Sequence, residues 1–238
     1  MSQKSAERRW EKKLHDREIL PLRPKISIGI KRDVHELLVE ATANRLANAF
    51  HQVMMDPNTM FGYIKVIRAP ANVGTPFKVG ERFQGRYDLA KAILDNLSSS
   101  PLKFLIGPIR FLLTHPPVQN VIDWIDDRFL SDYGEIQEIK LGPPQRGEQE
   151  IYQLRYAYVT GSPIAGSSTF TIVPTDGHNS RLTQIFLYQE VSSFYIKILS
   201  KDGIRFHNQV VYMQTKKSAD AINARITFTT IPKEYQDL

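Results

Sequence analysis

The sequence predicts an α+β fold in which a curved antiparallel β-sheet grips one long C-terminal helix. The last third of the chain carries this prediction, because three alternating segments, 151–160, 167–174 and 181–191, follow one another across short turns. A long stretch of helical periodicity, Ile204–Ile222, comes directly after them. Residues 90–130 lose the strand rhythm, which predicts a helical insertion into this framework.

The alternating segments place aromatic side chains together on one face. In the first segment, this face carries Tyr152, Leu154, Tyr156 and Tyr158. Turns are expected at 161–163 and 175–180, where glycine, proline and residues that tolerate positive φ gather. In the third segment, one face carries Phe186 and Tyr188, and the other face carries Ile185, Leu187 and Val191. Both faces of this strand are therefore expected to be covered.

The first half of the chain supplies further elements. The alternation of isoleucines in 25–31 predicts a strand. Asp33 and Glu36 have the spacing of a capping box, which predicts a helix from Val34 to about Met55. Three more strands are expected at Phe61–Ala69, Phe77–Leu89 and Ser131–Leu141, whereas Arg225–Ile231 fits either a short strand or a tail.

The insertion contains the most apolar window of the chain, Leu102–Leu113. Prolines at 101, 108, 116 and 117 restrict it to short helices. Three roles remain open for it: a helical layer over the core, a lid over a pocket, or a surface segment that dips into a membrane interface. In the lid interpretation, the covering residues are Phe104, Leu105, Phe111 and Leu112.

Length and composition favour one domain with an insertion. The chain has 238 residues, and no segment resembles an interdomain linker. We expect a basic helical N-terminal arm (1–24), a single domain (25–224) with a helical insertion (90–130), and a C-terminal tail (225–238). The absence of cysteine excludes disulfides and thiolate metal sites. A charged N-terminus and the lack of any apolar run near the ~20 residues that cross a bilayer lead us to expect a cytoplasmic protein.

The formal charge of +6 is concentrated near the N-terminus. Residues 1–25 contain eight Lys or Arg and four acidic residues, whereas the remaining chain has 23 basic and 21 acidic residues. A nucleic-acid-binding domain should show a basic face with interleaved aromatic residues, and no such pattern occurs, so no nucleic-acid partner is expected. The basic arm is interpreted as a solvated helix, or as a contact with anionic lipid or a partner.

Two segments, Pro76–Phe83 and Ser180–Leu187, lead into predicted strands within this order of elements. With the glycine-punctuated stretch 74–87, they resemble the START/Bet v 1-like (SRPBCC) superfamily of helix-grip proteins, which includes polyketide cyclases and lipid-transfer domains. The resemblance covers roughly Ile26–Ile222. The insertion and the basic arm are additions to the minimal fold of that superfamily.

The resemblance implies a cavity between sheet and C-terminal helix that holds a hydrophobic molecule such as a lipid or polyketide. The aromatic inner faces fit this, because tyrosine combines apolar surface with one hydroxyl and ligand pockets are mostly apolar with a few polar groups. The alternative is a solid core with hydroxyls at its rim. The candidate ligand-binding residues are Phe83, Tyr87, Leu89, Tyr152, Leu154, Tyr156, Tyr158, Phe186, Tyr188, Phe206 and Val210.

Motifs for chemistry are sparse. The six histidines lack metal-ligand spacing, and no G-x-S-x-G, P-loop or G-x-G-x-x-G occurs, so neither a metal nor a cofactor is expected. His207, on the predicted C-terminal helix, is the candidate for proton transfer, with Glu190 as its partner. The alternative is a rim histidine bonded to the backbone.

Three functional hypotheses follow. The first is non-catalytic binding or transport of a hydrophobic small molecule, with residues 90–130 controlling the entrance. The second is a cyclase- or dehydratase-like enzyme, in which cavity tyrosines and His207 polarise a carbonyl or move a proton. The third is an interaction module with a closed core that docks through the basic arm.

Overall fold

The computed structural model describes residues 14–22, 29–55, 60–61, 64–69, 72, 75–98, 101, 103–125, 131–142, 152–190, 200–233 and 236. Within these ranges, nine strands form one antiparallel sheet in the order β2-β3-β4-β5-β6-β7-β8-β1-β9. The strands are β1 Lys31–Val39, β2 Met60–Phe61, β3 Ile64–Arg68, β4 Arg82–Tyr87, β5 Asp132–Leu141, β6 Tyr152–Tyr158, β7 Ile164–Pro174, β8 Ser180–Glu190 and β9 Ile226–Thr229.

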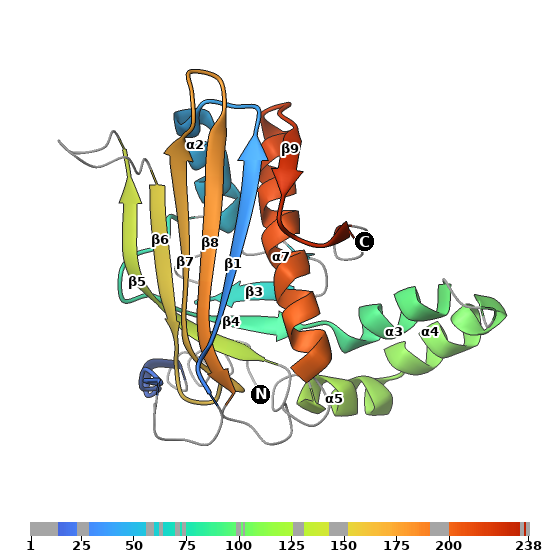
Figure 1. Ribbon diagram of the computed structural model, residues 1–238. Helices are drawn as coiled ribbons and strands as arrows, with labels where there is room; N and C mark the ends of the chain where they lie inside the picture. The colour runs from blue at the N-terminus through green and yellow to red at the C-terminus, as the bar shows by residue number, and fades with distance from the viewer. Residues whose placement is uncertain are drawn as a thin grey trace.

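Helices cover one face of this sheet and extend from its side (Figure 1). They are α2 Ala43–Met55, α3 Leu89–Ser98, the 3₁₀ helix η2 Lys103–Leu105, α4 Ile106–Thr114, α5 Pro116–Ile125 and α7 Ser200–Ala221. The long helix α7 packs against α2 and β1. The predicted α+β helix-grip arrangement, an antiparallel sheet with a long C-terminal helix, is therefore confirmed.

The strand meander β6-β7-β8 forms as the alternation predicts. Each strand pairs with the next in antiparallel register, and the turn at Thr175–Ser180 joins β7 to β8. The Asp176 carboxylate closes this turn by accepting hydrogen bonds from the backbone N–H groups of His178 and Asn179, both at 2.7 Å. Gly166 lies opposite Tyr188 with φ +126, and a Cβ there would come 2.0 Å from the Leu187 carbonyl oxygen, so this crossing requires glycine.

The predicted helix from Val34 is wrong at its N-terminal end. Residues Lys31–Val39 form strand β1, and α2 begins only at Ala43 and then runs unbroken to Met55. In β1 the buried side chains are His35, Leu37 and Val39, which is the two-residue period of a strand. The whole of β1 pairs with β8, and its last three residues, Leu37–Val39, also pair with β9.

Other boundaries also differ from the predictions. The strand expected over Phe77–Leu89 is limited to β4, and Leu89 already begins α3. The strand expected at Phe61–Ala69 is divided into β2 and β3, and β9 forms within Arg225–Ile231 and pairs with β1. The predicted strand at 25–31 lies mostly outside the described residues, as does most of the N-terminal arm. The division into arm, domain and tail stays a prediction.

The apolar core lies where α2 and α7 cover the sheet. Leu37, Leu182 and Ile172 stand side by side on neighbouring strands and are fully buried. Phe50 of α2 packs on them from above and meets the Tyr152 ring edge-on at 5.7 Å. Each such aliphatic side chain contributes ~1.5–3 kcal/mol on burial, so this cluster is the main source of stability.

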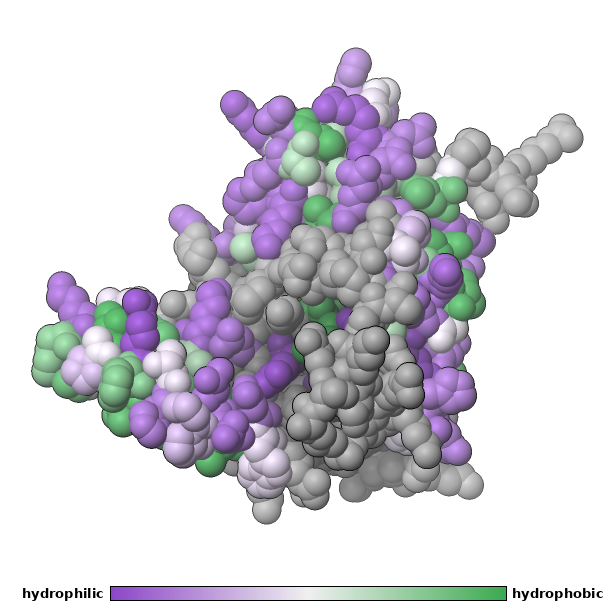
Figure 2. Space-filling model, turned by 180° about the vertical axis from the view of Figure 1, so that it is seen from behind, coloured by the Kyte–Doolittle hydropathy of each residue, from purple (hydrophilic) through white to green (hydrophobic). Residues whose placement is uncertain are grey.

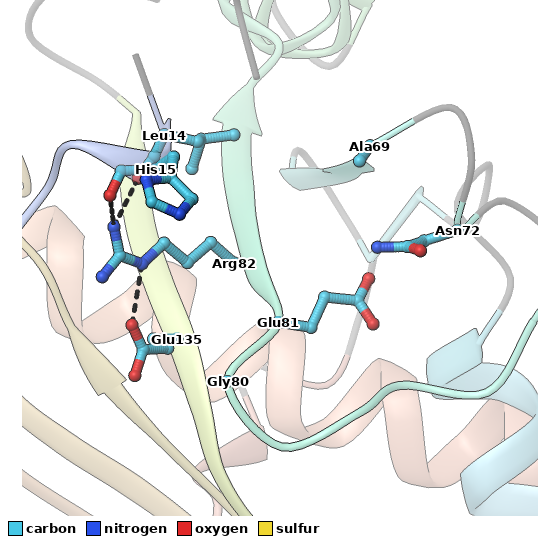
Figure 3. A pocket seen from close by; sticks show the side chains of 8 residues that line it. All are labelled: Leu14, His15, Ala69, Asn72, Gly80, Glu81, Arg82 and Glu135. Atoms are coloured by element: carbon cyan, nitrogen blue, oxygen red, sulfur yellow. Dashed lines mark hydrogen bonds and ion pairs between the residues drawn. The ribbon is translucent and has the colours of Figure 1, made fainter. Parts of the chain in front are cut away.

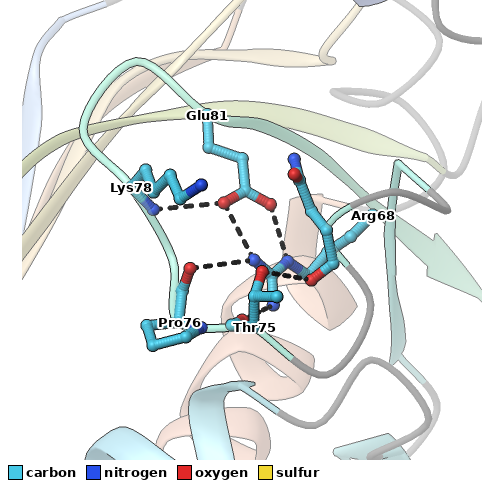
Figure 4. Close-up of polar contacts among 6 residues, drawn as sticks. Arg68, Thr75, Pro76, Lys78 and Glu81 are labelled. Atoms are coloured by element: carbon cyan, nitrogen blue, oxygen red, sulfur yellow. Dashed lines mark hydrogen bonds and ion pairs between the residues drawn. The ribbon is translucent and has the colours of Figure 1, made fainter.

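A buried ion pair fixes the segment before β4 (Figure 4). Arg68 and Glu81 form a two-point pair, with Nε–Oε1 at 2.6 Å and Nη2–Oε2 at 2.8 Å. The guanidinium also donates to the Thr75 carbonyl at 2.7 Å and lies 4.0 Å above the Phe77 ring. The Arg68 contacts tie residues 75–81 to β3, and the backbone N–H of Lys78 donates to the same carboxylate at 3.1 Å, which holds this segment in a turn. This cluster is structural.

The predicted helical insertion is confirmed as α3, η2, α4 and α5. These helices extend away from the body (Figure 1), and neither η2 nor α4 contains a buried residue. At the root of this arm, Ile122 is buried and Arg86 of β4 forms an ion pair with Asp123 of α5. Among the described residues, no helix is both long and apolar enough to cross a membrane.

Candidate ligand-binding site

The helix-facing side of the sheet changes from apolar to polar beyond the core. His35 is paired with Gln184 in the register of β1 and β8, one step along from the buried pair Leu37 and Leu182. On the next strand, Ser168 stands beside Phe186 and Tyr156. Together with His207 of α7, the side chains that meet here are His35, Tyr156, Ser168, Gln184 and Phe186; we call them the His207 cluster.

Aromatic rings form a continuous row through this cluster. The His207 ring stacks on Phe186 with centroids 4.0 Å apart and planes inclined by 16°, and Phe186 stacks on Tyr188 at 4.3 Å. The row continues from Phe186 to Tyr158 at 6.0 Å and from Tyr158 to Tyr156 at 5.6 Å. Phe83 of β4 meets Tyr156 edge-on at 5.3 Å, so the row crosses the sheet from β8 to β4.

The hydrogen bonds around His207 indicate which tautomer its neutral imidazole adopts. The Gln184 amide nitrogen lies 2.7 Å from Ser168 Oγ and 3.2 Å from His207 Nε2. Since this amide nitrogen has two N–H groups to donate, it serves both partners, and His207 Nε2 is the acceptor. The proton of the neutral imidazole then lies on Nδ1.

Three buried polar atoms of the cluster lack a partner in hydrogen-bonding geometry among the described residues, although the Asn208 side chain lies close enough to both histidine rings to raise their pKa values. They are His35 Nε2, Gln184 Oε1 and His207 Nδ1. Buried polar atoms are almost always hydrogen-bonded, because an unsatisfied one costs ~1–3 kcal/mol. Three such atoms therefore lie together in this part of the helix-facing side of the sheet.

Burial keeps the two histidines uncharged. It lowers the pKa of His207 to about 3, with a further lowering from the charge of His35, while the Asn208 side chain acts in the opposite direction. Burial likewise lowers the pKa of His35, against the attraction of Asp33 and the contact with Asn208. Near neutral pH the cluster is thus polar without positive charge, which suits an uncharged molecule with hydrogen-bonding groups.

Asp132 of β5 lies near enough to Tyr156 of the cluster for its charge to affect the tyrosine. Burial raises the pKa of Asp132 to about 7. Burial also raises the pKa of Tyr156, and the charge of Asp132 adds to this, whereas hydrogen bonds to Tyr158 and Ser168 lower it. A carboxyl group that titrates near neutral pH can both take up and release a proton, which is the property of a general acid–base.

The predicted ligand-binding residues separate into several groups. Phe83, Tyr156, Tyr158, Phe186 and Tyr188 form the aromatic row. Tyr152 and Leu154 belong to the apolar core near α2, and half-buried Val210 packs against that core. The side chains of Tyr87, Leu89, Phe206 and Glu190 lie outside the described part of the structure. Of the predicted lid residues, Phe104, Phe111 and Leu112 are exposed on the arm and Leu105 is half-buried. Their roles stay predictions.

Sequence reasoning missed His35, Ser168, Gln184 and Asp132. His35 was hidden by the mistaken helix prediction. Gln184 and Ser168 carry a usable signal, because each is a polar residue at an inward position of a strand whose neighbours two residues away are apolar or aromatic. The raised pKa of Asp132 depends on burial by distant segments and has no local signal.

No metal centre is formed by the described residues, where no three His, Asp or Glu side chains gather in one place. His35 and His207 have ring centroids 6.1 Å apart. The Nε2 atom of His207 already lies 3.2 Å from the Gln184 amide nitrogen, so its lone pair is occupied.

A hollow of about 430 Å³, separate from the His207 cluster, lies at the start of β4, beside Ala69 and Asn72 (Figure 3). Arg82 in this hollow is engaged in hydrogen bonds within the protein. It donates to the Glu135 carboxylate at 2.7 Å, to the backbone carbonyl of Leu14 at 2.8 Å and to the backbone carbonyl of His15. These contacts fasten residues 14–15 to the sheet. We regard this hollow as structural.

No protein-family model matches the chain, and no curated protein sequence matches it significantly. Similar solved structures include a point mutant of norcoclaurine synthase from Thalictrum flavum with a transition-state analogue, at 14% identity and a TM-score of 0.42, covering 83% of this chain and 99% of that one. The Zhui aromatase/cyclase from Streptomyces sp. R1128 is 10% identical with a TM-score of 0.45, covering 81% and 96%. A conserved protein from Geobacillus kaustophilus is 9% identical with a TM-score of 0.39, covering 80% and 97%. The helix-grip arrangement that the sequence led us to expect is shown by the antiparallel sheet and the long helix α7 themselves.

Proposed function

We propose that the protein binds an uncharged, largely apolar small molecule, lipid-like or polyketide-like, between the sheet and α7 at the His207 cluster. The aromatic row would supply apolar contact surface. The observation that carries the proposal is the set of three buried polar atoms without partners, His35 Nε2, Gln184 Oε1 and His207 Nδ1. Three polar atoms beside an aromatic wall would orient a molecule that bears a few carbonyl or hydroxyl groups.

The test is native mass spectrometry of the purified protein, followed by solvent extraction of the bound molecule. In a Gln184→Met variant, side-chain volume is nearly kept while the amide is removed. We expect the retained mass to be lost and the extracted compound to rebind at least about tenfold more weakly. The empty variant should be somewhat less stable than the wild type, because Ser168 Oγ and His207 Nε2 lose the Gln184 amide as a hydrogen-bond partner.

Gln214→Met is the matched control. Like Gln184, Gln214 is a buried glutamine with an unpartnered Oε1, but it lies on α7, about two turns beyond His207. It should keep the bound molecule. An empty wild-type protein that no lipid or polyketide stabilises would contradict the proposal. Equal retention by both glutamine variants would also contradict it, because the polar atoms would then have no part in binding.

A catalytic function of the cyclase or dehydratase type is the second candidate, and one observation favours it. Asp132 has its pKa raised to about 7, so it can exchange a proton at neutral pH, whereas His207, with a pKa of about 3, is a weak base. The acid–base group of this alternative would thus be Asp132. Incubation with β-keto thioesters and mass detection of lost water tests it. Turnover that is unchanged in Asp132→Asn would eliminate this role.

A further inference from the structure

The outer part of the helical arm exposes large apolar side chains. Phe104 is 71% exposed, Phe111 70% and Leu112 54%, and all three lie on η2 and α4. Seen from behind, apolar residues gather on the outer part of the projecting arm (Figure 2). We call residues 103–114 the arm tip. Isolated exposed apolar residues are common, but a concentrated group on a projecting element marks a surface that meets something apolar.

The charges of the arm tip are all positive. Lys103 and Arg110 are exposed, and neither forms an ion pair with a described residue. The sequence contains no Asp or Glu from Asn96 to Ile122. An apolar surface flanked by cations and free of acidic residues is complementary to a surface with an apolar interior and anionic headgroups.

The dimensions of the tip fit insertion to a shallow depth. Helix α4 has nine residues and is ~14 Å long, far less than the ~30 Å hydrocarbon core of a bilayer. Such a helix can lie in the interface with its apolar side chains pointing inward and its lysine or arginine reaching back to the headgroups. Buried Ile122 and the Arg86–Asp123 pair hold the base of the arm on the body, so the tip is presented outward.

We propose that the arm tip docks the protein on an anionic membrane surface by inserting Phe104, Phe111 and Leu112 into the interface. A second copy of the chain fits this surface less well, since pairing two identical tips brings Lys103 and Arg110 near their own counterparts. The docking is independent of the small molecule proposed for the His207 cluster. It gives the insertion a function that does not require it to cover the site.

Vesicle cosedimentation tests the proposal with the full chain. Phosphatidylcholine vesicles containing phosphatidylserine should bind the wild type, and pure phosphatidylcholine should bind it much less. Phe104→Glu with Phe111→Glu should abolish binding to both. Lys103→Gln and Arg110→Gln should each weaken binding to the anionic vesicles roughly fivefold. The matched controls are Val79→Glu, at a 64% exposed position outside the arm, and Lys233→Gln, and both should bind like the wild type.

Insertion depth distinguishes docking by the tip from adsorption elsewhere. A tryptophan placed by Phe111→Trp should add fluorescence that brominated lipids quench, whereas one placed by Val79→Trp should not. Binding that survives the double Phe→Glu change but is lost when the Lys and Arg of residues 1–25 are replaced would overturn the proposal in favour of the basic arm. A dimer in sedimentation velocity that Phe111→Glu dissociates, without vesicle binding, would assign the surface to a second copy.

Discussion

At the scale of single residues, burial shifts two titratable groups of the site in opposite directions. It lowers the pKa of His207 to about 3 and raises that of Asp132 to about 7. In both cases the uncharged form is favoured, because a low-polarity environment penalises charge whichever its sign. The two groups therefore have opposite effects on stability as the pH changes.

The His207 shift predicts a loss of stability in mild acid. The ordinary pKa of 6.5 applies to the unfolded chain, so between there and about 3 the unfolded chain binds a proton that the folded protein does not. The free energy of unfolding should be fully present above pH 6.5 and fall as the pH decreases. Urea titrations at about pH 7, 5.5 and 4.5 should show this fall, and His207→Phe should reduce it. A slope unaltered by His207→Phe would refute the account.

The Asp132 shift predicts the opposite dependence. The unfolded carboxyl ionises near 3.8, whereas the folded one stays protonated up to about 7, so stability is fully present below 3.8 and is lost as the pH rises through 7. Asp132→Asn should therefore raise the unfolding free energy at about pH 8 and change it little at about pH 4. Asp176→Asn should act in the opposite sense at about pH 8, because backbone and side-chain hydrogen bonds lower the pKa of Asp176. An Asp132→Asn variant less stable than the wild type at pH 8 would show that the carboxylate is stabilising.

At the scale of elements, β1 shows where local patterns mislead. Asp33, Glu36, Leu37, Leu38 and Ala41 fit a capped helix, yet the segment is a strand with Leu37 inward and Leu38 less buried. The deciding interactions come from β8 and β9, about 150 and 190 residues away along the chain. A local window does not contain those partners, whereas the contiguous meander β6-β7-β8 has its partners nearby and was predicted correctly.

A pair of alanine substitutions tests the strand assignment of this segment. Leu37 is fully buried, so Leu37→Ala should cost ~2–5 kcal/mol of unfolding free energy. Leu38 points to the opposite, partly exposed face, so Leu38→Ala should cost about 1 kcal/mol. Denaturant titration of the two variants measures the difference. Equal large losses would indicate that both side chains are buried, as the helix interpretation required.

The candidate site follows the same division between local and distant information. The aromatic row could be predicted because Tyr156, Tyr158, Phe186 and Tyr188 alternate within single strands. In the polar centre, Ser168 and Gln184 carry a local signal as polar residues at inward strand positions, but their meeting with His35 depends on the register of β1, β7 and β8. The proposed partner of His207, Glu190, has its side chain outside the described residues, and the neighbour observed is Gln184.

At the scale of the whole molecule, the helix-facing side of the sheet is divided into a stabilising part and a part with unsatisfied polar atoms. Around α2, rings and aliphatic side chains are fully buried and packed, with Phe50 in contact with Tyr152 and Phe170. Around His207, three buried polar atoms lack partners. The unpartnered atoms around His207 lower the free energy of unfolding unless a bound molecule forms hydrogen bonds with them. Functional sites commonly lower the stability of the fold that carries them in this way.

This division predicts that stability and binding can be changed separately. Phe50→Ala should lower the free energy of unfolding by ~3–5 kcal/mol, because a fully buried ring leaves a cavity, while the affinity for the extracted molecule stays within about twofold at temperatures where the variant is folded. Gln184→Met should weaken binding at least about tenfold and cost less unfolding free energy than Phe50→Ala, because it removes two hydrogen bonds and leaves no large cavity. Phe50→Leu provides a milder variant if the alanine protein does not fold. Denaturant titration measures the free energy of unfolding, and native mass spectrometry on the same samples measures the affinity. If the Phe50 variants lost stability and affinity in parallel, the core near α2 would itself be part of the binding site.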